Sequence, residues 1–527
     1  MNLTSHIVQR ILKLDPPATR DLLVQRGLRV PMPDGAELLA DRWAPRTTAA
    51  PLPTALIRGP YGRRGIYGAL LARPLAERGY QVVIQSVRGT FGSGGDFDPM
   101  RQERDDGLAT LAWVREQPWF GDAIVLFGLS YLGYTQWAVA DQLPTEVKAL
   151  IPHLTESAAT LELLRKDGLS LETPFGWGAM VARQERRFGS VQPLVQDRRH
   201  RRALSVLPLS RADTAAAGHP VNYIQDFLIH DAEDPRWAGI DHSHRVSQVS
   251  VPVSSVAGWY DIFLPGQLRD FRILQDAGRP ARLTVGPWTH LDLDGTAVRE
   301  AVDFGLAYAR GSQPVPRAPV RLYVMGADTW RDFDTWPPQG YSPQRWHLHA
   351  DGALSDQTSG ESAPDRYRYD PADPTPGVGG VRMTLRGAGR VDNTELEARP
   401  DVLTYTSTTL TDDVEVIGDV TAEIWFRSSR PFADVFVRLC DVDPAGRSVN
   451  VCDGLTRFGE AGRVVVEMGP AGHRFRPGHR IRLQVSGGAH PRFLRNYGTG
   501  EPPGPATTMV PTETTIRHTS SLVLPVV

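Results

Sequence analysis

The chain has few of the residues from which disulfide-bonded or zinc-bound frameworks are built. Its 527 residues include only two cysteines, Cys440 and Cys452. Two cysteines exclude a disulfide framework, and they exclude a zinc site made of cysteines. We expect two free, buried thiols, with pairing as the alternative if they lie on adjacent strands. We also expect no metal ion and no other cofactor.

Long apolar segments and an excess of one charge are lacking too. No uninterrupted apolar run is long enough to span a bilayer. Residues 1–14 carry His6, Arg10 and Lys13 among their apolar side chains, unlike a signal peptide. The 58 basic and 60 acidic residues leave a formal net charge of −2, which gives no general attraction to nucleic acid or anionic lipid. We expect a cytoplasmic protein with no nucleic-acid or membrane partner.

Short β-rich runs alternate with amphipathic segments in the first part of the chain. This rhythm predicts a largely parallel sheet that is covered by helices on both faces. We place this α/β core at residues 1–155 and 248–311. The predicted strands after an initial hairpin lie at residues 54–59, 80–87, 123–128, 149–153, 251–257 and 281–286.

The rhythm breaks twice. Residues 156–247 contain few β-type runs, and we predict a mostly helical insertion that covers the strand ends as a cap. Residues 312–319 contain three prolines, which is typical of a linker. Short alternating runs with glycine and proline turns follow, beginning at 320–324. They predict an all-β domain of the sandwich or jelly-roll type over residues 316–527.

Ser130 follows a strongly apolar predicted strand and precedes a predicted helix over residues 131–141. A serine on a sharp strand-to-helix turn stands clear of the sheet, as the nucleophile of a serine hydrolase does. The segment reads Gly128-Leu129-Ser130-Tyr131-Leu132-Gly133. Its second glycine comes three residues after Ser130, one later than in the common pattern. The alternative role for Ser130 is that of an ordinary helix cap.

Two further strands end in the residue types that a serine nucleophile needs. Asp261 follows the strand at 251–257, and His290 follows the strand at 281–286. Because ligand sites lie at the carboxyl ends of strands in open α/β sheets, both side chains are expected near Ser130. His290 would accept the Ser130 proton, and Asp261 would orient the His290 ring. The alternatives are a helix-capping carboxylate and a surface histidine.

A serine hydrolase also needs donors for the oxyanion that forms during acyl transfer. The backbone N–H of Tyr131 is one candidate by its position after the nucleophile. The hydroxyl of Tyr61, in the loop after the strand at 54–59, is the second. Tyr61 could instead be a half-buried aromatic residue that packs on its loop.

These segments resemble the cocaine-esterase-like branch of the X-prolyl dipeptidyl-peptidase group, the CocE/NonD-type serine hydrolases. The similarity rests on residues 128–133, 258–261 and 286–290, and on Pro60-Tyr61. Further similar segments lie at residues 87–90, 116–119, 319–322 and 330–331, so the resemblance covers nearly the whole chain. It implies an α/β-hydrolase core, a helical cap and a C-terminal jelly-roll domain. It also implies that the late Gly133 belongs to the family pattern.

The resemblance does not transfer a substrate, because the cap matches only loosely. The candidate pocket residues are aromatic side chains near the predicted site, each with core packing as an equal alternative. They are Phe175, Trp177, Trp259, Phe263 and Trp288.

Three hypotheses about function remain at this point. The first is a serine carboxylesterase that forms an acyl-enzyme on a small-molecule ester. The second is an amidase or peptidase of the same group, which would hold a substrate α-amino group with carboxylates such as Glu156, Glu162, Asp167 or Glu172. The third is a binding protein with an inert core. A homodimer is left open.

Overall fold

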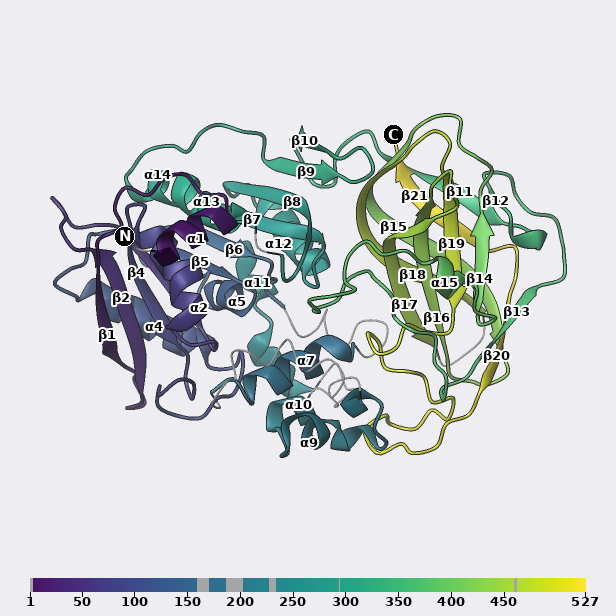
Figure 1. Cartoon of the computed structure of the whole chain (residues 1–527), viewed down its shortest axis with the longest axis horizontal. Coiled ribbons are helices and arrows are strands. Elements are labelled where there is room, and N and C mark those ends of the chain that lie inside the picture. Colours follow the sequence, from purple (N-terminus) through teal and green to yellow (C-terminus); the bar gives the residue numbers. More distant parts are fainter. Residues whose placement is uncertain (1–2, 159–169, 186–201, 227–233, 293, 459–461) are drawn as a thin grey trace.

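The computed structural model describes residues 3–158, 170–185, 202–226, 234–292, 294–458 and 462–527. Within these residues an α/β part with one ten-stranded sheet precedes an all-β part with two further sheets (Figure 1). This order agrees with the fold class expected from the sequence.

The ten-stranded sheet has the order β1-β2-β4-β3-β5-β6-β7-β8-β9-β10. Its strands from β4 to β9 run parallel, whereas β1, β2 and β10 pair antiparallel with their neighbours. The bounds are β1 Leu22–Pro31, β2 Glu37–Pro45, β3 Thr54–Gly59, β4 Gln81–Ser86, β5 Ile124–Leu129, β6 Val147–His153, β7 Val253–Tyr260, β8 Ala281–Thr289, β9 Val320–Val324 and β10 Thr329–Phe333.

Helices bury both faces of this sheet, which explains why its central strands are apolar throughout. Side chains of α1, α3, α13 and α14 share one apolar cluster with the sheet, and side chains of α4, α5 and α12 share the other. The bounds are α1 Leu3–Ile11, α2 Gly65–Tyr67, α3 Arg73–Ala76, α4 Glu103–Arg115, α5 Tyr131–Trp137, α12 Leu264–Asp276, α13 Thr296–Glu300 and α14 Leu306–Ala309, with π-helical turns at Gly68–Ala72 and Ala301–Gly305.

The described residues between β6 and β7 are helical and contain no paired strand, in agreement with the predicted cap. Their apolar cluster includes Leu494, Tyr497 and Ala506, so this insertion packs directly on the β domain. The elements are α7 Glu172–Val181, α9 Ala212–Ala217, α10 Asn222–Asp226 and α11 Ser243–Val246, with 3₁₀ turns at Leu209–Arg211 and Pro235–Ile240.

One strand assignment made from the sequence is wrong. Residues 320–324 were expected to open the β domain, but they form β9, which pairs parallel with β8 at the edge of the α/β sheet. The hairpin partner β10 extends the same sheet. The alternate residues Val320, Leu322 and Val324 are fully buried against β7 and β8. An alternating run after a proline-rich linker fits the edge of either sheet, and only tertiary packing selects one.

The β domain therefore begins with β11. All of its strand pairs are antiparallel, and its two sheets enclose a common apolar core. Cys440 and Cys452 are free thiols on the neighbouring strands β16 and β17, as expected. The bounds are β11 Ser342–Leu348, β12 Leu354–Ser355, β13 Asp365–Tyr369, α15 Thr394–Glu397, β14 Val402–Thr406, β15 Val414–Ser428, β16 Ala433–Val442, β17 Ser448–Phe458, β18 Gly462–Phe475, β19 Arg480–Ser486, β20 Thr512–Ile516 and β21 Ser521–Val526.

Two buried histidines, His153 and His242, and the partly buried His490 make the stability of the fold depend on pH. Burial lowers the pKa of His153 and of His242 to about 3, and that of His490 to about 4. In the unfolded chain these rings become protonated as the pH falls through about 6.5, whereas in the native state they stay neutral until a much lower pH. The unfolding free energy should therefore decrease as the pH falls from about 6.5 to about 4, by up to about 1.4 kcal/mol per pH unit and histidine.

Denaturant unfolding at pH 7 and pH 5 measures this dependence. His153→Gln should make it shallower, whereas His6→Gln, on the exposed face of α1, should leave it unchanged. Equal stability at the two pH values would contradict the prediction.

Candidate active site

Ser130 lies on the tight turn that joins β5 to α5. Its backbone has φ +58° and ψ −128°, a conformation that costs a residue with a side chain on the order of 1–3 kcal/mol. Hydrogen bonds hold the turn, since the Ser130 N–H donates to the His153 carbonyl at 2.9 Å and the Gly133 N–H donates to the Ser130 carbonyl at 2.8 Å. The predicted strand-to-helix placement of Ser130 is therefore present.

Two glycines allow this turn to pack closely. A Cβ atom at Gly128 would lie 2.4 Å from Leu132 Cβ, and one at Gly133 would lie 2.4 Å from Thr155 Cγ2. The late glycine of the motif is thus needed where α5 approaches the loop after β6.

Asp261 and His290 follow β7 and β8 directly and meet Ser130 at this edge of the sheet. His290 Nε2 lies 3.0 Å from Ser130 Oγ, and His290 Nδ1 lies 2.6 Å from Asp261 Oδ2. Asp261 is fully buried, and its Oδ1 accepts the Phe263 N–H at 2.8 Å. The carboxylate therefore holds the short loop between β7 and α12 and faces the imidazole at the same time. This chain of contacts can carry a proton from the serine to the histidine while the carboxylate holds the ring.

The two candidate oxyanion donors lie next to each other. The Tyr131 N–H occupies the first position of α5, where a helical N–H has no partner within the helix. The Tyr61 and Tyr131 rings form an edge contact at 6.5 Å. Burial, together with the neighbouring Tyr67, holds the pKa of Tyr61 well above its usual value, while hydrogen bonds from Trp177 and Ser130 oppose this shift. The Tyr61 hydroxyl is therefore protonated at neutral pH and able to donate.

The loop that carries Tyr61 is fixed by a cluster of ion pairs around a buried aspartate, which sequence reasoning missed. Arg63 and Arg64 both donate to the Asp41 carboxylate, each at 3.0 Å, and Arg63 also donates to the Phe91 carbonyl at 2.8 Å. Asp41 is fully buried in β2. An aspartate at a position of β2 that alternates with buried apolar residues was the sequence signal that could have indicated such a partner.

Sequence reasoning also missed a buried ion pair that holds the side chain of Tyr131. The Tyr131 hydroxyl donates to Glu103 Oε1 at 2.8 Å, and Arg58 Nη2 lies 3.1 Å from Glu103 Oε2. Burial raises the pKa of Glu103, and Arg58 and Tyr131 oppose that shift. Arg58 is the only charged residue of the otherwise apolar strand β3, and a buried charge of this kind requires a partner.

Two of the five candidate pocket aromatics lie at the site. The Phe263 ring contacts His290 at 5.4 Å, and Trp177 Nε1 donates to the Tyr61 hydroxyl at 2.9 Å. The ring of Trp177 is only partly buried, as expected of a residue beside a substrate.

The other three aromatics make packing contacts. Phe175 belongs to the apolar core of the cap, and Trp259 packs between the α/β sheet and the β domain. Trp288 contacts Trp330 of β10 at 5.9 Å. These contacts give no support to a pocket role, because each follows from ordinary core packing.

A loop of the β domain, residues 377–392, reaches the site from the opposite side. Val381 and Met383 of this loop pack against the apolar cluster of Tyr134, Ile262 and Phe263. Arg382 donates to Glu172 of α7 at 2.7 and 2.5 Å, which joins the loop to the cap. Sequence reasoning did not identify this loop, because its contacts span more than a hundred residues.

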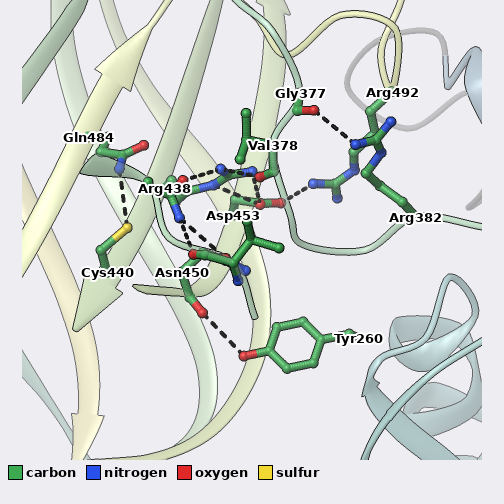
Figure 2. A network of polar contacts seen from close by, with 12 residues as sticks. Tyr260, Gly377, Val378, Arg382, Arg438, Cys440, Asn450, Asp453, Gln484 and Arg492 are labelled. Carbon is green, nitrogen blue, oxygen red and sulfur yellow. Dashed lines mark hydrogen bonds and ion pairs between the residues drawn. The ribbon is translucent and has the colours of Figure 1, made fainter. Parts of the chain in front are cut away.

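Buried charges anchor the loop to the β domain (Figure 2). Arg438 donates to Asp453 at 3.1 and 2.9 Å and to the Val378 carbonyl at 2.5 Å. Arg492 pairs with the other oxygen of Asp453. Figure 2 also shows the Tyr260 hydroxyl next to Asn450, whose carbonyl it reaches at 3.2 Å. The residue before Asp261 is thereby tied to the β domain.

Metal chemistry finds no support among the described residues, which contain no group of three histidine, cysteine, aspartate or glutamate side chains able to hold an ion. Within the same residues, no helix has both the length and the apolar character needed to cross a bilayer.

Comparisons with known proteins match both parts of the chain. The model of the X-Pro dipeptidyl-peptidase (S15 family) matches residues 34–292, and that of the X-Pro dipeptidyl-peptidase C-terminal non-catalytic domain matches residues 315–522. Cocaine esterase of Rhodococcus sp. (strain MB1 Bresler) is 34% identical over 542 aligned residues, covering 90% of this chain and 93% of the relative.

Solved structures share the fold. An aminopeptidase from a marine-sediment Thaumarchaeota archaeon has a TM-score of 0.81 at 19% identity, covering 96% of each chain. An α-amino acid ester hydrolase has a TM-score of 0.79 at 20% identity, covering 98% of each chain. A CocE/NonD family hydrolase from Staphylococcus aureus has a TM-score of 0.70 at 17% identity, covering 96% of this chain and 94% of that one.

The fold, the serine on its strand-to-helix turn and these matches define the class of the protein, which is that of the serine hydrolases. Within this class the chain belongs to the S15 family of X-Pro dipeptidyl-peptidase relatives, in the group that contains cocaine esterase.

The packing of the turn at Ser130 can be tested by adding one carbon atom. Gly133→Ala places a methyl group against Thr155, so α5 must shift relative to the loop after β6. We expect kcat to fall about tenfold to a hundredfold, because a displacement of about 1 Å at a reacting group costs roughly that factor. Gly239→Ala is the matched control, since a Cβ atom there meets nothing within 4 Å. Equal kcat values for the two variants would contradict this account.

Proposed function

We propose that the chain hydrolyses a small-molecule carboxylic ester through an acyl-enzyme on Ser130. The observation that carries the proposal is the position of His290, whose two ring nitrogens face Ser130 Oγ at 3.0 Å and Asp261 Oδ2 at 2.6 Å. In this proposal Ser130, His290 and Asp261 are the catalytic triad.

The first half of the proposed reaction forms the acyl-enzyme. Ser130 Oγ attacks the ester carbonyl while its proton passes to His290 Nε2, and Asp261 stabilises the imidazolium. The carbonyl oxygen becomes an oxyanion that accepts hydrogen bonds from the Tyr131 N–H and the Tyr61 hydroxyl. The intermediate then collapses, and His290 gives its proton to the departing alcohol.

The second half regenerates the enzyme. Water attacks the acyl carbon while His290 takes one of its protons, and the same two donors bind the second oxyanion. Collapse of this intermediate breaks the bond to Ser130, which regains its proton from His290, and the carboxylic acid leaves.

Hydrolysis of α-amino acyl substrates is the second candidate function, and the described carboxylates do not favour it. Glu172 is paired with Arg382, so its charge is already neutralised. Glu156 is buried against α12, close enough that a Cβ atom at Gly266 would collide with its carboxylate. Glu162 and Asp167 lie outside the described residues. The name of the relative cocaine esterase also favours an ester.

Several finer expectations stay proposals. They are a jelly-roll connectivity for the two-sheet domain, a cytoplasmic location, a pocket role for Trp177 and Phe263, a homodimer, and the absence of nucleic-acid and membrane partners.

Ser130→Ala is expected to reduce kcat for hydrolysis of an activated aryl ester by roughly 10⁴-fold or more, because it removes the Oγ atom that carries the acyl group. The same substitution should abolish labelling of the protein by a fluorophosphonate. Ser312→Ala, which removes an exposed hydroxyl in the linker, should keep both activities. A Ser130→Ala variant with full ester hydrolysis would overturn the proposal, and failure of the unmodified protein to label would favour an inert binding protein.

Turnover of paired acyl esters, with and without a free α-amine, separates the two candidate functions. We expect the α-amine to give no advantage, so the kcat/KM of the amino ester should not exceed that of its deamino analogue. A preference of more than about tenfold for the amine, equal to about 1.4 kcal/mol, would instead indicate a carboxylate site for it.

A further inference from the structure

Trp177 of the cap helix α7 contacts both candidate oxyanion donors. Its Nε1 atom lies 2.9 Å from the Tyr61 hydroxyl, and its ring stacks on the Tyr131 ring at 6.0 Å with an interplanar angle of 12°. Tyr61 and Tyr131 come from the loop after β3 and from the start of α5. A single side chain of the insertion therefore joins two elements of the α/β core at the reaction centre.

The direction of the hydrogen bond has a chemical consequence. An indole N–H can only donate, so the Tyr61 oxygen must be the acceptor. This occupies one lone pair of Tyr61 and leaves its own proton to point toward another acceptor. The Ser130 side chain lies near enough to Tyr61 to affect the pKa of its hydroxyl. The proton of Tyr61, which Trp177 does not engage, is therefore available to an oxyanion formed at Ser130.

Both rings are held firmly enough for this orientation to persist. Trp177 also packs against Phe97 at 6.5 Å and against Tyr223 at 6.0 Å. Tyr61 stacks on Tyr67 at 5.3 Å with an interplanar angle of 17°. Because hydrogen-bond donors stabilise a developing charge best when they need no reorientation, this packing favours hydrogen bonding from the Tyr61 hydroxyl to the oxyanion.

We propose that Trp177 is a positioning residue that directs the Tyr61 hydroxyl toward the oxyanion, and that the cap thereby completes the oxyanion hole. The inference rests on the proposed hydrolysis at Ser130 and adds a role for the cap in that reaction. Trp177 acts through Tyr61, so its effect must disappear when the Tyr61 hydroxyl is absent.

Trp177→Phe keeps an aromatic ring on Tyr131 and removes the N–H donor. We expect kcat for an activated aryl ester to fall about three- to tenfold, the factor that corresponds to one net hydrogen bond, while KM changes little. Trp113→Phe, at a half-buried tryptophan of α4 that packs on Trp119, is the matched control and should keep the original kcat.

The decisive measurement repeats Trp177→Phe in a Tyr61→Phe background. Loss of the Tyr61 donor alone is expected to lower kcat by about 10²- to 10³-fold. If Trp177 acts through Tyr61, adding Trp177→Phe lowers kcat no further. If Trp177 is only a wall of the substrate pocket, Trp177→Phe changes KM by the same factor in both backgrounds, and the inference is overturned.

A transition-state analogue provides an independent readout. An aryl trifluoromethyl ketone adds to a catalytic serine and places a charged oxygen among the oxyanion donors. Its affinity should fall by the same factor as kcat/KM in Trp177→Phe, and unchanged affinity would contradict the inference. If Trp177→Phe does not fold, benzothienylalanine at position 177 replaces the N–H by sulfur with the ring shape retained, and the same outcomes apply.

Failure of this inference differs from failure of the proposed function. An active Ser130→Ala variant would overturn the function itself. The role of Trp177 alone would be overturned if Ser130→Ala is inactive but the kcat losses of Trp177→Phe and Tyr61→Phe multiply in the double variant.

Discussion

The turn between β5 and α5 is the constraint on which the candidate site depends. The buried strand delivers Ser130 to the edge of the sheet, and a positive φ angle turns its side chain out of the packed interior. This strained conformation is maintained by the hydrogen bonds of the turn and by the close packing of Gly133 against Thr155. Since parallel strands end at one edge, the residues after β7 and β8 reach the same place.

Elements outside the α/β core then complete the surroundings of Ser130. Trp177 of the cap contacts the Tyr61 hydroxyl, and the loop at 377–392 of the β domain packs on the apolar cluster that contains Phe263. Each element is fixed by charged groups that are removed from water, and such groups are costly unless they are paired. The Arg438–Asp453 pair meets this requirement, because both side chains are about 99% buried and each has several partners. The Arg438–Asp453 pair thereby holds the loop at 377–392 on the β domain, and the Arg382–Glu172 pair joins that loop to the cap.

Much of the site could be anticipated from strand ends. Ser130, Asp261 and His290 each follow an apolar run, and the order of those runs implied a shared edge. The edge strand β9 was assigned to the wrong sheet, since a short alternating run carries no information about its pairing partner. The aromatic residues were ambiguous for a similar reason. Trp177 and Trp259 each follow a glycine in a largely apolar segment, but only Trp177 lies beside Tyr61.

The sequence by itself determined the α/β core, the helical insertion and the all-β domain, together with the nucleophile turn and the two residues that follow β7 and β8. These features are local, because hydrophobic periodicity and the residues at strand ends are encoded over short segments. Only the tertiary structure decided that Trp177 donates to Tyr61, that Glu172 is neutralised by Arg382, and that β9 extends the first sheet. Those contacts join segments 37 to 210 residues apart, and no local pattern specifies which distant side chain a buried donor or charge will meet.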